Sequence, residues 1–122
     1  MSDMEIEKEI LAKGKTAPRL TPDDIEAVIA SEHYFTAGDG YAGAAALNAQ
    51  EGDLIVPPEQ LDLVTFCVII LKNGYTVSGK SACVSPENFD PEIGRKVARK
   101  NAIEEIWPLE GYLLKQKLSE QV

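Results

Sequence analysis

The longest hydrophobic run of the chain, residues 64–71, is apolar at every position except Thr65. Such a run predicts a strand in the centre of a sheet or covered on both faces. Asn73 and Gly74 follow it and predict a two-residue type I′ turn. Residues 75–84 then alternate weakly and are more polar, so we expect the returning strand nearer an edge. The pattern predicts a β-hairpin of about residues 62–72 and 75–84.

A two-residue turn also fixes which residues of the hairpin face each other. It places Gly79 opposite Val68, where a glycine indicates either the close approach of another group or a bulge or bend. It places Cys67 and Cys83 on opposite faces, roughly 10 Å apart along the strand. We therefore expect two small buried thiols and no disulfide between them.

Two short helices are predicted before the hairpin. Residues 4–13 carry Ile6, Ile10 and Leu11 on one stripe and mostly charged residues on the other. Thr21 and Pro22, followed by two aspartates, have the pattern of an N-cap, an N1 proline and an acidic first turn. We expect this second helix to run to about residue 31.

The C-terminal part predicts two further helices. Asp90-Pro91-Glu92 repeats the cap, proline and acid pattern, and apolar residues follow at helical spacing to about residue 106. Pro108 cannot donate to the carbonyl of Glu104, so a helix must end or kink near Trp107. The predicted helices are residues 91–106 and 108–119. Together they leave apolar surface that suggests burial against a second copy.

Residues 38–58 show no regular pattern and are interpreted as a variable loop, with a short strand expected just before it at residues 33–36. The glycines of this loop are not interpreted as a phosphate-binding fingerprint, because the strand expected before them is not in the required frame. With 122 residues the chain has room for one core, so we predict a single α+β domain over residues 1–122.

The composition is acidic, with 20 Asp and Glu against 12 Lys and Arg and a net charge of −8. This balance argues against binding to long nucleic acids or anionic membranes, which are held mainly through Lys and Arg. The N-terminus lacks the apolar core of a signal peptide and no run is long enough to span a membrane, so we expect a cytoplasmic protein.

Positive charge is concentrated at one place, where Arg95, Lys96, Arg99 and Lys100 fall within six residues. Arg95 and Arg99 are four apart, so their side chains leave one helix face and can converge on one anion. The alternative is a solvated helix face or a set of intramolecular ion pairs, for which an acidic protein offers many partners. A small anionic ligand fits this local charge better than a polymer does.

Other candidate ligand-binding residues flank this helix. Asn88 and Phe89 precede it, and Tyr75 and Lys80 lie on the returning strand. An aromatic ring, an amide and several cations are what a base and its phosphates require. Phe89 has the alternative role of an apolar staple against the helix.

No catalytic constellation is found. His33 is the only histidine, and no serine, cysteine or acid stands at a recognisable spacing from it. Two cysteines are too few for a zinc site without further ligands. We expect no enzyme activity, no metal and no cofactor.

Several segments resemble one phage-encoded family, named for gene product 49 of phage N4 and gene product 66 of phage Sf6. They are residues 65–68, 71–90, 92–96 and 106–114, and residues 15–22 resemble the family's leader, which adds Arg19 to the candidate ligand-binding residues. Only residues 38–58 depart from the resemblance.

This family is also similar to the first group of Thoeris anti-defence proteins, which sequester cyclic ADP-ribose isomers made by bacterial TIR-domain enzymes. The resemblance implies a sponge that binds such a signal without cleaving it, with cyclic oligonucleotides as further candidate ligands. It also implies a homo-oligomer built from dimers, a hexamer as a trimer of dimers, in the cytoplasm of the infected host. Paired arginines on the C-terminal helix transfer to Arg95 and Arg99. The alternative function is that of a phage accessory protein that acts on a host protein through its C-terminal helices.

Overall fold

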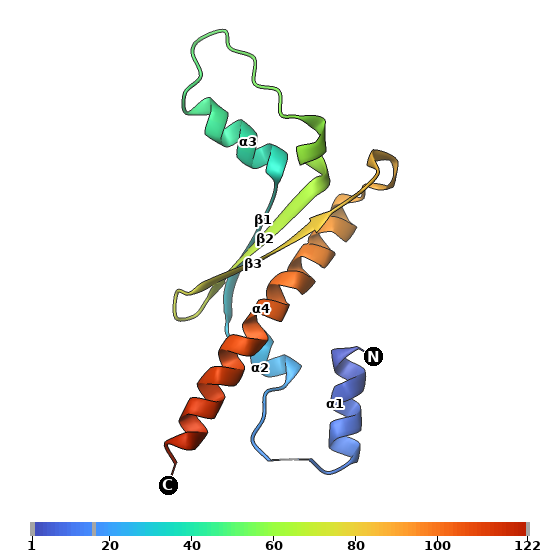
Figure 1. Cartoon of the computed structure of the whole chain (residues 1–122), viewed down its shortest axis with the longest axis vertical. Coiled ribbons are helices and arrows are strands. Elements are labelled where there is room, and N and C mark those ends of the chain that lie inside the picture. The colour runs from blue at the N-terminus through green and yellow to red at the C-terminus, as the bar shows by residue number, and fades with distance from the viewer. Residues whose placement is uncertain (1, 16, 122) are drawn as a thin grey trace.

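The computed structural model describes residues 2–15 and 17–121. A three-stranded antiparallel sheet in the order β1-β2-β3 lies against one long helix, α4, which crosses the sheet diagonally (Figure 1). The elements in chain order are α1 (Asp3–Ala12), α2 (Pro22–Ala27), β1 (Ile29–Thr36), α3 (Ala37–Ala46), η1 (Glu59–Leu63), β2 (Val64–Leu71), β3 (Thr76–Ala82), η2 (Pro86–Asn88) and α4 (Pro91–Ser119). The prediction of a small α+β fold built on a hairpin is confirmed.

The core lies between the sheet and α4. Side chains of the central strand β2 alternate between buried positions and half-buried ones. The buried residues of β2 are Thr65, Cys67, Ile69 and Leu71, and α4 contributes Ala98, Ala102 and Ile106. The prediction that β2 is central is confirmed, but only one of its faces is fully covered.

The hairpin turn differs from the prediction by one residue. The Leu71 amide donates to the Tyr75 carbonyl at 2.8 Å, and Gly74, with φ +90°, donates to the Leu71 carbonyl at 2.8 Å. This is a three-residue loop with a bulge at the glycine rather than a two-residue type I′ turn. The side chain of Asn73 accepts a hydrogen bond from the Tyr75 amide at 2.9 Å and stabilises the longer loop.

The longer loop shifts the pairing of the strands, so Gly79 lies opposite Cys67 and not opposite Val68. The predicted placement of the two cysteines on opposite faces was therefore wrong, because a one-residue shift moves side chains to the other face. Cys67 is buried and Cys83 is half-buried, and both are free thiols as expected. Burial raises the pKa of the Cys67 thiol.

Gly79 marks a close approach, and the approaching group is α4. A Cβ atom at this position would collide with the Ala98 carbonyl and the Ala102 amide. The small residues Ala98 and Ala102 complete the contact from the helix side, and both are fully buried. Nearby, the Asn101 side chain donates to the Lys80 carbonyl at 2.8 Å and ties α4 to strand β3. Of the two predicted roles of Gly79, the close approach is confirmed.

The predicted break between two C-terminal helices was wrong. α4 continues from Pro91 to Ser119 with Pro108 inside it. A proline removes one hydrogen bond of the helix, and packing on both sides of it can hold the rest in place. Here Ile106 is fully buried and Trp107 packs against the core, while Pro108 is exposed.

Two boundaries in the N-terminal half also differ. α2 ends at Ala27 rather than near residue 31, because Ile29 already pairs with Leu71 and the Lys72 amide donates to the Val28 carbonyl at 2.9 Å. The short strand expected at residues 33–36 is therefore the end of an eight-residue strand.

The segment predicted as a loop, residues 38–58, begins with most of helix α3. The helix starts with a reciprocal capping box between Thr36 and Asp39 and continues through alanines. In Figure 1, α3 lies beyond the end of the sheet near which α4 begins. Within the described residues, no helix is long and apolar enough to cross a membrane.

Candidate ligand-binding pocket at the start of α4

The four clustered cations have different surroundings in the structure. Lys96 pairs with Glu92 at 3.2 Å and Lys100 with Glu104 at 3.8 Å, each one helical turn away. These pairs are largely exposed, and exposed pairs contribute little to stability. The two lysines therefore match the alternative of a solvated helix face.

Arg99 is held by two carboxylates from two other elements. Its Nε lies 2.8 Å from both carboxylate oxygens of Glu32 on β1, and its Nη1 and Nη2 lie 3.0 and 2.7 Å from the two oxygens of Glu26 in α2. The hydrogen bonds to Glu26 raise the pKa of the guanidinium, burial opposes that shift, and the bonds to Glu32 add to it. Arg99 thus joins α4, α2 and β1 and does not converge with Arg95 on one site.

Arg95 is exposed and, within the described part of the chain, has no carboxylate within 4.0 Å. It lines an open cavity of about 190 Å³ between the start of α4 and the ends of β1 and β2. The other lining residues are Tyr34, Phe35, Thr36, Asp39, Thr65, Phe89 and Pro91. We call this the Arg95 pocket.

Three of the eight lining residues are aromatic. Phe89, half-buried between η2 and α4, was predicted from the sequence as a ligand residue or a staple, and it lines the pocket. Tyr34 and Phe35 come from the end of β1, and Phe35 stacks on Phe66 with ring centroids 5.6 Å apart. Burial is the main cause that raises the pKa of Tyr34 to about 12, so the phenol is neutral at physiological pH.

Asp39, which was not predicted as a site residue, also lines the pocket and brings a carboxylate to it. Its Oδ2 accepts from the Thr36 amide at 2.9 Å, and its own amide donates to Thr36 Oγ1 at 3.0 Å. The capping box therefore fixes the side chain at the first turn of α3. The sequence signal for this capping role is the Thr-x-x-Asp spacing, but the surrounding glycines favoured the interpretation of the segment as a loop.

The amides at the start of α4 are already capped. Asp90 Oδ1 accepts from the Glu92 amide at 2.9 Å and from the Ile93 amide at 3.2 Å. The first turn also packs tightly on the sheet, since a Cβ at Gly94 would lie 2.9 Å from Thr65 Oγ1. The positive group that this end of the helix offers to a ligand is therefore the Arg95 side chain.

Three other predicted residues lie outside the lining of the Arg95 pocket. Asn88 is exposed in η2, and Lys80 is exposed beside Phe66 on the strand pair. Tyr75 lies at the hairpin turn, where it lines a separate cavity with residues of the C-terminal half of α4. The structure thus brings Phe89 and Arg95 together and leaves these three apart.

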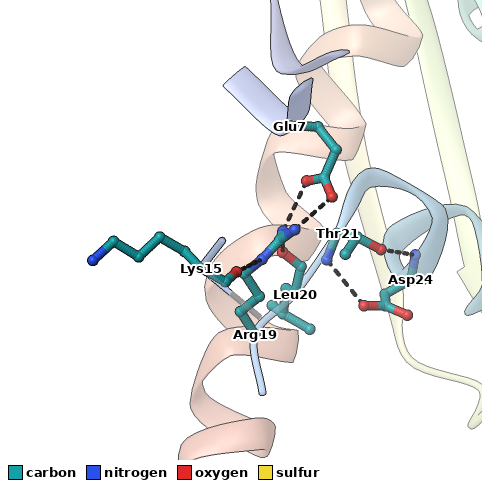
Figure 2. Close-up of polar contacts among 6 residues, drawn as sticks. All are labelled: Glu7, Lys15, Arg19, Leu20, Thr21 and Asp24. Atoms are coloured by element: carbon teal, nitrogen blue, oxygen red, sulfur yellow. Dashed lines mark hydrogen bonds and ion pairs between the residues drawn. The ribbon is translucent and has the colours of Figure 1, made fainter. Parts of the chain in front are cut away.

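Arg19 serves as an attachment point for α1. Its Nη2 and Nη1 lie 2.6 and 2.8 Å from the two carboxylate oxygens of Glu7, and its Nε donates to the Lys15 carbonyl at 3.4 Å (Figure 2). The hydrogen bonds lower the pKa of Glu7 and raise that of Arg19. This predicted ligand residue is therefore occupied by an intramolecular ion pair.

The pocket lacks the donors of a metal centre. Nowhere in residues 2–15 and 17–121 do three His, Cys, Asp or Glu side chains come together so that they could hold a metal ion. The arrangement that remains is an unpaired guanidinium, aromatic rings, hydroxyls and one carboxylate. Such a set can bind an organic anion by charge, stacking and hydrogen bonds.

A family model for the Phage protein (N4 Gp49/phage Sf6 gene 66) family matches residues 20–118. The chain belongs to this family. The match of the N4 Gp49/Sf6 gene 66 family includes the whole sheet and every residue that lines the Arg95 pocket, while Glu7 and Arg19 precede it. Searches of curated proteins and of solved structures return no significant match.

Proposed function

We propose that this phage protein is an anti-defence sponge that binds a cyclic nucleotide immune signal in the Arg95 pocket and sequesters it without cleavage. The signal is a cyclic ADP-ribose isomer, and cyclic oligonucleotides are further candidates. The protein would act in the cytoplasm of the infected bacterium. The observation that carries the proposal is the unpaired Arg95 among aromatic rings.

The chemistry of the pocket supports a nucleotide over a plain anion. A guanidinium can form forked hydrogen bonds to a phosphate, and it is not used here by any described carboxylate. Phe89 and Tyr34 line the pocket and offer aromatic surface for a base. The negative charge of the whole chain disfavours long polyanions but does not prevent one local contact to a compact ligand.

The size of the pocket supports a role for a second subunit. Ligand sites usually enclose about 300 to 1,000 Å³, whereas the Arg95 pocket of one chain offers about 190 Å³. A cyclic dinucleotide or ADP-ribose isomer would extend beyond it, and a neighbouring copy could close the site. We therefore include a dimer, assembled further into a hexamer, in the proposal.

The structure changes the role that we assign to Arg99. We had predicted that Arg95 and Arg99 grip one phosphate, but both ends of the Arg99 fork face carboxylates. We assign Arg95 to the ligand and Arg99 to support, because Arg99 fixes β1, whose last residues form the aromatic wall of the pocket.

A capture experiment tests this proposal. The purified protein is incubated with the product of a TIR-domain enzyme, filtered free of unbound nucleotide and heat-denatured, and the released molecules are separated by chromatography. We expect the signal molecule to be recovered intact. Recovery of no nucleotide would contradict binding, and recovery of a degraded nucleotide would contradict sequestration without cleavage.

Two charge-matched variants locate the site. Arg95→Gln should abolish capture with no change in oligomer size, because it removes the charge that contacts the phosphate. Lys72→Gln removes the same charge from the exposed hairpin turn and should capture as the wild type does. Equal capture by both variants would place the site elsewhere.

A second candidate function rests on another surface. Tyr75 and Tyr112 are 58% and 75% exposed, and with Leu109 and Leu113 they line a mainly apolar cavity of about 280 Å³. Exposed apolar surface of this kind marks protein interaction sites. It favours the alternative that the protein acts on a host protein through α4, which a Tyr112→Glu variant would separate from nucleotide capture.

A further inference from the structure

The Arg95 pocket contains two opposite charges that do not neutralise each other. Arg95 and Asp39 both line it, yet no salt bridge within 4.0 Å joins them in the described part of the chain. Each side chain is exposed and stands on a rigid helix, Asp39 in the first turn of α3 and Arg95 in the second turn of α4. The cavity therefore offers an acceptor of hydrogen bonds and a cation at separate positions.

The two oxygens of the Asp39 carboxylate differ in their hydrogen-bond partners, because only one of them takes part in the capping box. Oδ2 accepts from the Thr36 amide, while Oδ1 has no hydrogen-bond donor among the described residues. An ionised carboxylate oxygen can accept hydrogen bonds but cannot donate one. The Asp39 carboxylate therefore repels a phosphate group, but it can accept a hydrogen bond from a neutral ligand group that carries an O–H or N–H.

A single free oxygen also limits which donor fits. Guanine presents two parallel N–H donors that a carboxylate binds with both oxygens, and one of the two is already used here. A ribose hydroxyl needs one acceptor, and carboxylates on ribose hydroxyls are a recurrent contact in nucleotide sites. The free oxygen of Asp39 matches a sugar hydroxyl best.

We propose that Asp39 selects ribonucleotides, because it accepts a hydrogen bond from a ribose hydroxyl of the ligand whose phosphate binds Arg95. This inference rests on the proposed function and adds the group that gives the site its specificity. Ligands with only one of the two features, inorganic phosphate or a deoxynucleotide, would bind more weakly than the ribonucleotide.

Titration calorimetry with four probes tests the inference. The probes are cyclic ADP-ribose, inorganic phosphate and 2′,3′-dideoxy-AMP compared with AMP. Asp39→Asn is the decisive variant, because the asparagine carbonyl can still cap α3 while an amide donor replaces the free oxygen. Circular dichroism of the variant confirms that the helix is retained.

We expect Asp39→Asn to weaken cyclic ADP-ribose and AMP about 10-fold or more, the loss for one hydrogen bond to a charged group. The same variant should bind inorganic phosphate at least as tightly as the wild type, since a repulsive charge is gone. It should also lose the preference for AMP over the dideoxy analogue. This opposite effect on nucleotide and phosphate cannot come from general unfolding.

The outcomes separate the two proposals. Unchanged affinity of Asp39→Asn for the ribonucleotides, with binding lost in Arg95→Gln, would overturn the role of Asp39 and leave the sponge proposal standing. Failure of the wild type to bind cyclic ADP-ribose, AMP or any product of a TIR-domain enzyme would overturn both.

Discussion

Arg95 and Arg99 stand one helical turn apart on α4, yet their surroundings are opposite. Arg99 donates four hydrogen bonds to Glu26 and Glu32 and joins three elements. Arg95 lies at the edge of a cavity without a carboxylate within 4.0 Å in the described residues. The difference arises from their neighbours, since α2 and β1 bring acids to Arg99, whereas β1 and the residue before Asp90 bring aromatic side chains to the pocket of Arg95. Two identical side chains on one helix thus have separate roles in stability and in binding.

Both regions depend on how closely α4 packs on the sheet, so the largest effect is expected at Gly79. Gly79→Val would place a side chain against the backbone of Ala98 and Ala102 and push the helix away. We expect a loss of at least about 3 kcal/mol in the free energy of unfolding, measured by urea denaturation.

Gly43→Ala is the control, because a Cβ there meets no atom within 4 Å and the residue lies inside helix α3. It should stabilise the protein by about 0.5–1 kcal/mol. A Gly79→Val protein as stable as the wild type would contradict the close packing of α4.

The comparison of the two arginines is tested directly by Arg99→Ala and Arg95→Ala. Removal of Arg99 leaves Glu26 and Glu32 without their partner, and we expect a loss of about 1–3 kcal/mol in the free energy of unfolding. Arg95→Ala removes no ion pair and should change stability by less than about 0.5 kcal/mol. Equal destabilisation by the two variants in urea denaturation would contradict the separate roles of Arg95 and Arg99.

The wall of the pocket can be examined through the ionisation of Tyr34. Burial raises its pKa to about 12, above the ordinary value of about 10. Because the folded protein favours the neutral phenol, this stabilisation is complete below pH 10 and is lost as the pH rises through 12. Ultraviolet titration at 295 nm should show one late tyrosine step that Tyr34→Phe removes. A titration curve identical in both proteins would show that Tyr34 is not shielded.

Arg19, which lies outside α4, is a third arginine that can be compared with Arg95 and Arg99. Arg19 forms a similar forked pair with Glu7 of α1 (Figure 2). Arg19→Ala should increase hydrogen exchange in residues 3–12 while exchange in β2 stays unchanged. Faster exchange in the sheet would contradict a local role.

The lowered pKa of Glu7 gives this attachment a dependence on pH. A carboxylate with a depressed folded pKa contributes above its unfolded value near 4.5, and the contribution is lost as the pH falls through the folded pKa. Protection of α1 should therefore decline in that acidic range, and Glu7→Gln should abolish the decline.

Much of the fold could be predicted from local signals. The apolar run 64–71 marked β2, and the Thr21 and Asp90 caps marked the starts of α2 and α4, because these patterns act within a few residues. The hairpin register could not be predicted, since an Asn-Gly pair is compatible with a two-residue and with a three-residue loop, and the longer loop carries a hydrogen bond from the Tyr75 amide to the Asn73 side chain. The continuity of α4 through Pro108 depended on packing around Ile106 and Trp107, which is not a local property.

The candidate site was only partly predictable for the same reason. Phe89 and Arg95 are close in sequence and on one helix start, so their proximity could be inferred. Tyr34 and Asp39 join them only through the pairing of β1 with β2 and through helix α3. The carboxylates that occupy Arg99 are 67 and 73 residues away in the chain, which no spacing rule reveals.

The most direct test of the account is to follow the Nε–H signals of the two arginines by NMR while cyclic ADP-ribose is added. We predict that the Arg95 signal shifts and saturates with the ligand, while the Arg99 signal stays at its position in the free protein because Glu32 continues to hold it. A ligand-dependent shift of Arg99 with an unmoved Arg95 would contradict the division of roles between the two arginines.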